Sequence, residues 1–111
     1  MTHSRDCMIF IETPVFTSDL KEHLDDEEYR ALQAYLAEHP EAGSLLEETG
    51  GLRKIRWAAK GKGKSGGVRV IYYHVTAAHQ IRMILIYRKG IVDTLTSSQK
   101  AQLRALNKGW K

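Results

Sequence analysis

The sequence predicts an α+β fold, a small antiparallel β-sheet with helices packed on one face, in the order β-α-α-β-β-β-α. Three observations lead to this class. Runs of β-branched and aromatic residues separated by turn residues fill the segment 52–87, and apolar residues recur at helical spacing before and after it. No repeat or linker composition interrupts the chain, and its 111 residues fit one domain spanning 1–111.

The beginning of the chain predicts a strand and a short helix. Residues 8–11, Met-Ile-Phe-Ile, are rich in β-branched and aromatic side chains, and Pro14 stops this run, which is typical of a strand. Thr17 or Ser18 then offers a side-chain oxygen to cap the first turn of a short helix.

A longer helix comes next. Asp25 and Glu28 have capping-box spacing, and His39-Pro40 ends the helical pattern. The apolar residues that recur at helical intervals between them are Tyr29, Leu32, Tyr35 and Leu36. A polar connector follows over residues 41–51.

The segment 52–59 alternates between two faces of a predicted strand. Ile55 and Trp57 lie on the face expected to be core, whereas Lys54 and Arg56 fall side by side on the other face, available to a ligand. Four glycines make residues 60–67 a turn region.

Two further strands and a helix complete the layout. Residues 68–75 return from the turn, and residues 80–87 pair with them after a short link, which predicts an antiparallel meander. Thr96 and Gln99 have capping-box spacing. The apolar stripe of this last helix is expected to consist of Leu103, Leu106 and Trp110.

Charge is strongly segregated along the chain. Residues 51–89 hold ten Lys and Arg and no Asp or Glu, whereas residues 1–50 hold twelve of the thirteen acids. The formal net charge of +4 hides this difference. Ten cations on neighbouring strands repel one another unless a polyanion is their partner, so the sequence predicts an anion-binding face.

Several kinds of chemistry are disfavoured. Residues 61–65 match the end of a phosphate-binding loop, but Ala58 stands where its first glycine belongs and no helix is predicted after it. The histidines have no zinc-site spacing, and the acid-free segment offers no catalytic triad. The lone Cys7 suits a reducing compartment, and neither a signal peptide nor a membrane span is expected, which favours a cytoplasmic location.

RNA is the polyanion that the basic face fits best. Tyrosines lie among the cations, and those that point outward can stack on unpaired bases. An RNA 2′-hydroxyl is an internal nucleophile, so aligning it and stabilising the charge of the transition state suffices for cleavage. A lysine crowded by other cations is a plausible general base.

The residues that carry these features resemble a known family. Residues 50–56 (Gly-Gly-Leu-Arg-Lys-Ile-Arg), the glycine-lysine turn 60–64 and residues 66–73 (Gly-Gly-Val-Arg-Val-Ile-Tyr-Tyr) closely resemble the HigB-2 branch of the RelE/ParE toxin superfamily. The resemblance extends over nearly the whole chain, including residues 26–30 and 86–87. It implies a RelE-like fold and a bacterial type II toxin that enters the ribosomal A site and cuts translated mRNA without a cofactor. It also implies a cognate antitoxin, commonly one with a helix-turn-helix DNA-binding domain.

The resemblance also assigns roles to residues. The Lys-Ile-Arg strand matches the family's catalytic strand, so Lys54 and Arg56 are implied as base and phosphate stabiliser. Arg69 matches the arginine that grips the scissile phosphate, and Lys89 matches an assisting lysine. The other expected RNA contacts are Arg53, Lys60, Lys62, Lys64, Tyr73, Arg82 and Arg88.

Two other functions stay open at this point. One is a non-catalytic RNA- or ribosome-binding module, a degenerate toxin whose Arg88-Lys89-Gly90 end has lost the chemistry. The other is a ParE-like gyrase inhibitor, against which the set Lys54, Arg56 and Arg69 argues.

Overall fold

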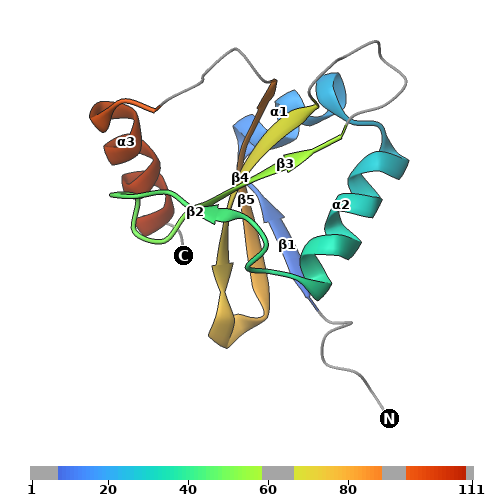
Figure 1. The fold of residues 1–111 in the computed structure, drawn as a ribbon, viewed down its shortest axis with the longest axis horizontal. Helices are drawn as coiled ribbons and strands as arrows, with labels where there is room; N and C mark the ends of the chain where they lie inside the picture. Colours follow the sequence, from blue (N-terminus) through green and yellow to red (C-terminus); the bar gives the residue numbers. More distant parts are fainter. Residues whose placement is uncertain (1–7, 59–66, 89–94, 110–111) are drawn as a thin grey trace.

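The computed structural model describes residues 8–58, 67–88 and 95–109, and Figure 1 shows the arrangement of its elements. Their order is β1 (Ile9–Glu12), α1 (Pro14–His23), α2 (Asp26–Glu38), β2 (Ser44–Leu45), β3 (Arg53–Trp57), β4 (Val68–Val75), the 3-10 turn η2 (Thr76–Ala78), β5 (Gln80–Arg88) and α3 (Ser97–Lys108). The predicted α+β class is confirmed, and β2 is a short strand that the polar connector did not suggest.

The sheet is mixed rather than wholly antiparallel. Its strand order is β1-β5-β4-β3-β2. The antiparallel pairs β3-β4 and β4-β5 confirm the predicted three-stranded meander, and β2 adds a further antiparallel pair with β3. β1 pairs parallel with β5, with Ile9 opposite Gln80. The parallel pairing arises because α1 and α2 carry the chain from β1 to the far edge of the sheet, and the meander then returns toward β1.

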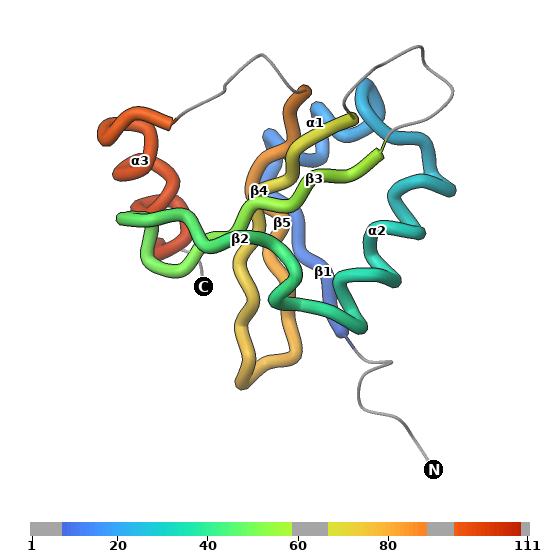
Figure 2. The backbone as a smooth tube through the Cα atoms, in the orientation of Figure 1, coloured from blue at the N-terminus to red at the C-terminus, as the bar shows by residue number. Residues whose placement is uncertain are grey.

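Helices cover both faces of the sheet, which corrects the expectation of one covered face. We call the face under α1 and α2 the first face and the face under α3 the second face; Figures 1 and 2 show α2 and α3 on opposite sides of the central strands. On the first face, Phe16, Leu32 and Leu36 pack against Val70 and Tyr72. The second-face cluster contains Leu52, Ile71, Ile84 and Tyr87, with Leu103 of α3 against it.

The physical reason for two covered faces lies in β4 and β5. Both strands direct apolar side chains to the first face and to the second face. A helical layer on one face alone would therefore leave the apolar side chains of the other face in water. A register shift between Ile71 and Tyr72 pairs them with Leu85 and Met83, leaving Ile84 as an extra residue on β5. Both Ile84 and Leu85 consequently join the cluster beneath α3.

Capping residues account for where the helices begin. The predicted capping boxes at Asp25–Glu28 and Thr96–Gln99 are confirmed. The predicted cap of α1 at Thr17 or Ser18 is wrong, because α1 begins at Pro14 and Thr13 is its N-cap. Proline is favoured at the first helical position, where its missing N–H leaves no hydrogen bond unmade.

A half-buried tyrosine, Tyr29, joins α2 to β1 and predicts sensitivity to alkaline pH. The Tyr29 hydroxyl donates a hydrogen bond of 2.6 Å to Glu12, whose other oxygen accepts one of 2.6 Å from Thr17. Burial, and then the Glu12 carboxylate, raise the pKa of Tyr29, and burial also raises the pKa of Tyr72. The folded state therefore holds these protons more tightly than the unfolded state does.

We expect this linkage to destabilise the protein at high pH. The contribution of Tyr29 to the free energy of unfolding is complete below the pKa of an unfolded tyrosine, about 10. Above that pH the contribution falls by about 1.4 kcal/mol per pH unit. Denaturant unfolding of the wild type and of Tyr29→Phe from pH 8 upward, with pH 8 as the common reference, measures this slope. Equal slopes in both proteins above a pH of about 10 would show that this hydroxyl is not linked to folding.

Candidate functional site

The alternation predicted for β3 is present in the structure. Ile55 is buried in the first-face cluster and Trp57 packs against it, so the predicted core side is confirmed. Lys54 and Arg56, at the alternate positions, consequently point to the second face with Leu52. Arg56 is exposed and Lys54 is half-buried.

Arg56 and Arg69 face each other across two neighbouring strands. Arg56 of β3 is the direct partner of Arg69 of β4, and Arg69 is in turn the partner of Tyr87 on β5. Side chains in such positions have Cβ atoms about 4.5–5.5 Å apart, and like charges there destabilise a sheet. The row Arg56, Arg69, Tyr87 thus places two cations side by side at a free-energy cost.

Lys54 lies beside this row. It is two residues before Arg56 on the same strand face, opposite Ile71 of β4 and Ser44 of β2. No Asp or Glu occurs on β2, β3, β4, β5 or α3, so these elements offer the three cations no carboxylate. We call Lys54, Arg56 and Arg69 the basic row; an anion bound there would relieve their repulsion.

Two other predicted RNA contacts lie apart from the basic row. Arg53 points to the first face, where its Nη1 donates hydrogen bonds of 3.1 and 2.8 Å to the carbonyls of Glu41 and Gly43. Arg88 is opposite Val68, whose side chain belongs to the first-face core, and is exposed. Neighbouring residues of a strand point to opposite faces, so a run of basic residues is divided between them.

Tyr73 and Arg82 lie on the second face, further along the strands. They are direct cross-strand partners, and the Arg82 guanidinium carbon is 5.7 Å from the centre of the Tyr73 ring. Arg82 Nη1 donates to the carbonyl and the side-chain oxygen of Asn107, at 3.2 and 3.0 Å. The structure thus brings Lys54, Arg56, Arg69, Tyr73 and Arg82 to one face.

Asn107 is a residue that the sequence reasoning missed. Leu106 was predicted to belong to the buried stripe of α3. This prediction is wrong, because Leu106 is 44% exposed whereas Asn107 is 8% exposed. Asn107 follows Leu103 by four residues, so helical spacing alone places both on one side of α3. Asn107 was not included in the predicted apolar stripe because its side chain is polar.

The remaining predicted site residues lie outside the described residues, as does Trp110 of the predicted stripe; they are Lys60, Lys62, Lys64 and Lys89.

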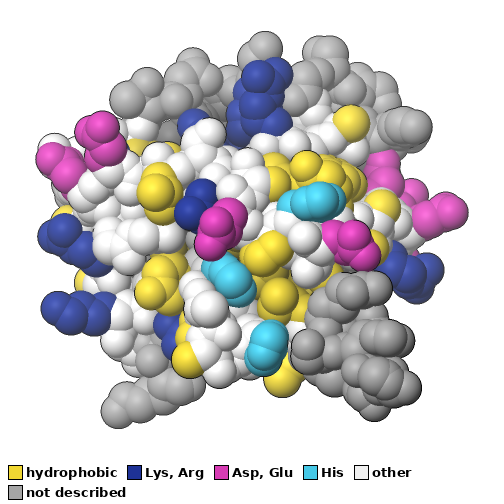
Figure 3. Space-filling model, turned by 60° about the horizontal axis from the view of Figure 1, so that its bottom comes forward, with side chains coloured by type: hydrophobic (Ala, Val, Ile, Leu, Met, Phe, Trp, Pro, Cys, Tyr) yellow, Lys and Arg dark blue, Asp and Glu magenta, His cyan; other side chains and the backbone are white. Residues whose placement is uncertain are grey.

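The described residues contain neither a metal-ligand group nor a membrane-spanning helix. Figure 3 shows histidine side chains that are separated from one another, and the described ranges contain no group of three or more His, Cys, Asp or Glu able to hold a metal ion. Across residues 8–58, 67–88 and 95–109, no helix is both long and apolar enough to cross a membrane.

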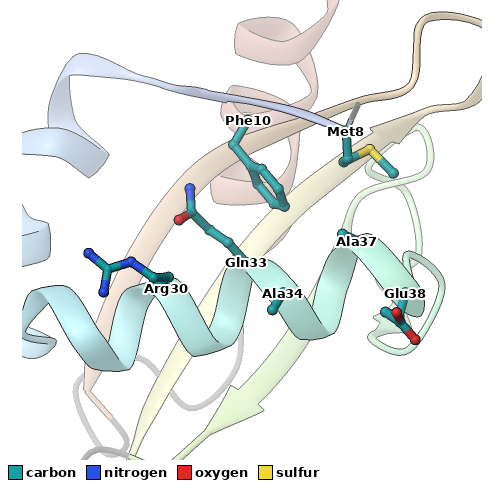
Figure 4. A pocket seen from close by; sticks show the side chains of 7 residues that line it. All are labelled: Met8, Phe10, Arg30, Gln33, Ala34, Ala37 and Glu38. Carbon is teal, nitrogen blue, oxygen red and sulfur yellow. The ribbon is translucent and has the colours of Figure 1, made fainter. Parts of the chain in front are cut away.

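A hollow also lies between α2 and the edge strand β1. Figure 4 shows Phe10 of β1 extending toward α2, with Arg30 and Gln33 among the α2 residues around the hollow, whose volume is about 370 Å³. It is on the first-face side, because α2 packs there. The hollow and the basic row therefore lie on opposite faces of the sheet.

Comparisons with known proteins identify the fold. No family model matches the chain. A solved structure of the Escherichia coli toxin RelE, a free-state mutant with two arginines replaced by alanine, superposes with a TM-score of 0.57 at 14% identity. The match covers 90% of this chain and 96% of that one. The chain therefore has the fold of the RelE toxin.

Proposed function

We propose that this chain, as a single domain spanning residues 1–111, is the toxin of a bacterial type II toxin–antitoxin system. It is a metal-independent endoribonuclease of the HigB-2 kind that cleaves translated mRNA in the ribosomal A site and so inhibits translation. The observation that carries the proposal is the facing pair Arg56 and Arg69, with Lys54 beside it, on acid-free strands. Such a pair presents two guanidinium groups side by side, and guanidinium groups match the oxygens of a phosphate.

The chemistry needs only these cations and the RNA itself. The 2′-oxygen forms a bond to phosphorus, the bond from phosphorus to the 5′-oxygen of the next nucleotide breaks, and a cyclic phosphate and a 5′-hydroxyl result. Arg56 and Arg69 stabilise the extra negative charge on the phosphoryl oxygens, as preorganised donors do. Lys54, in its neutral form, is the base that takes the 2′-hydroxyl proton, a water molecule gives a proton to the leaving 5′-oxygen, and Lys89 assists.

The partners follow from this role. The toxin binds mRNA and the ribosome in the cytoplasm, and a cognate antitoxin, commonly a helix-turn-helix DNA-binding protein, neutralises it. The fold shared with the toxin RelE supports this assignment. Lys60, Lys62 and Lys64 are proposed to contact ribosomal or messenger RNA backbone.

Expression of the chain alone in a bacterium, with mapping of mRNA 5′ ends, tests the proposal. We expect growth arrest and new 5′ ends inside translated frames, which disappear when translation initiation of that mRNA is blocked. Arrest without such ends would point instead to a non-catalytic ribosome-binding module or, if purified protein inhibits DNA supercoiling, to a gyrase inhibitor. Cleavage of untranslated RNA at the same sites would contradict ribosome dependence.

A further inference from the structure

Another hollow, whose lining is basic, lies on the second face, between the last turn of α3 and strands β4 and β5. Its volume is about 490 Å³. The residues around it include Gly50, Tyr73, Arg82, Arg104, Asn107 and Lys108. Its lining holds three cations and no Asp or Glu. The hollow is therefore concave, polar and positively charged.

Arg82 is held in one orientation at this hollow. Its Nη1 donates to both oxygens of the nearly buried Asn107, its Nε donates to Gln80 at 3.0 Å, and its guanidinium stands over the Tyr73 ring. A guanidinium fixed by several contacts loses little side-chain entropy when an anion binds.

Arg104, which lines the hollow, lies against the neighbouring loop at Gly50, a residue without a side chain. Its Nη1 donates to the carbonyl of Glu48 at 3.3 Å. Gly50 has a φ of 78°, and a Cβ there would lie 3.3 Å from Arg104 Cγ. The glycine therefore lets the arginine lie close to the loop.

Helix capping explains only part of this charge. Cations are favoured near the C-terminus of a helix, where the backbone carbonyls carry about half a negative charge. Arg82 already donates to the Asn107 carbonyl in this last turn. Arg104 and Lys108, both exposed, add two further charges, which exceed the partial charge of the helix end.

The hollow and the basic row share one sheet face. Tyr73 follows Arg69 by four residues on β4, a separation of about 13 Å along the strand. We propose that the hollow is a second anion subsite, which binds a phosphate of the RNA strand held at the basic row. The identity of the polyanion as RNA rests on the proposed function. Ile71, between Arg69 and Tyr73 on β4, is fully buried in the cluster under α3, so an RNA strand bound at both positions passes over α3 rather than along β4. The hydroxyl-bearing ring of Tyr73 is part of the lining of the hollow.

The test compares two variants that lose the same charge. Arg104→Ala/Lys108→Ala removes two cations of the hollow, and Lys21→Ala/Arg30→Ala removes two from α1 and α2. The probe is a fluorescent single-stranded oligoribonucleotide of about ten nucleotides, within the range of known single-strand sites. Affinity is measured over a series of salt concentrations, and thermal unfolding checks that both variants are folded.

We expect the hollow variant to bind the RNA about tenfold more weakly than the control variant. Its plot of log affinity against log salt should be less steep by about 0.7, because one lost phosphate contact on a single strand contributes about that much. Equal affinities and slopes in the two folded variants, or no RNA binding by the wild type, would overturn the subsite.

An oligoglutamate peptide of matched charge separates RNA from an acidic protein partner. If the hollow variant loses affinity for the peptide but not for RNA, the hollow is a peptide site and the proposal is wrong. Ribosome-dependent cleavage, assayed separately, tests the proposed function on its own. A wild type that never cleaves but shows the expected RNA slopes would overturn that function and keep the subsite.

Discussion

Arg69→Ala should lower cleavage of translated mRNA by about 100- to 1,000-fold, the usual effect of removing one preorganised donor to a transition-state charge. The loss should appear in the rate of the bond-breaking step, since Arg56 and the rest of the basic row remain to bind the RNA backbone. Single-turnover cleavage on programmed ribosomes measures that rate, and growth arrest on expression of the variant should disappear.

Arg69→Ala should lose cleavage activity without a matching loss of folding stability. Arg69 faces Arg56 directly, so truncation removes a like-charge contact, and the free energy of unfolding should stay within about 1 kcal/mol of the wild type. Arg30→Ala, an exposed arginine on α2, is the matched control and should cleave normally. A folded Arg69→Ala protein that remains fully toxic would remove Arg69 from the reaction.

Gly67→Ala should destabilise the protein by more than about 2 kcal/mol, because two penalties act at the same residue. Its φ of 66° is in the left-handed region, where a Cβ is unfavourable. An added Cβ would also collide with the backbone carbonyl oxygen of Trp57, which cannot rotate away as a side chain does. The collision pushes β3 from β4 where Arg56 faces Arg69, so cleavage should fall even well below the melting temperature.

Gly109→Ala provides the comparison for this substitution. Gly109 has a φ of −78°, and a Cβ there would lie 3.5 Å from its nearest neighbour, an ordinary contact. We expect a stability change within about 0.5 kcal/mol. Thermal and urea unfolding of both variants give the difference directly. Equal stabilities would mean that β3 and β4 do not approach as closely at Gly67 as the structure has them.

Local patterns in the sequence were enough to predict most elements. The capping boxes of α2 and α3 and the bounds of β4 were predicted correctly, because a cap or an alternation depends on residues only a few positions apart. The same local rule placed Lys54 and Arg56 together on one side of β3. The start of α1 was predicted wrongly, because the capping hydroxyls of Thr13 and of Thr17 or Ser18 lie within five residues of one another and local spacing does not choose between them.

The sequence by itself determined the α+β class, the charge segregation and the alternation along each strand. Only the tertiary structure decided that Arg56 faces Arg69, that Arg53 and Arg88 lie apart from them, and that Asn107 holds Arg82. The tertiary structure also placed α3 on the second face and β1 parallel to β5. The physical reason is that register, layer and strand direction depend on pairing between segments far apart in the chain, which no short-range spacing specifies.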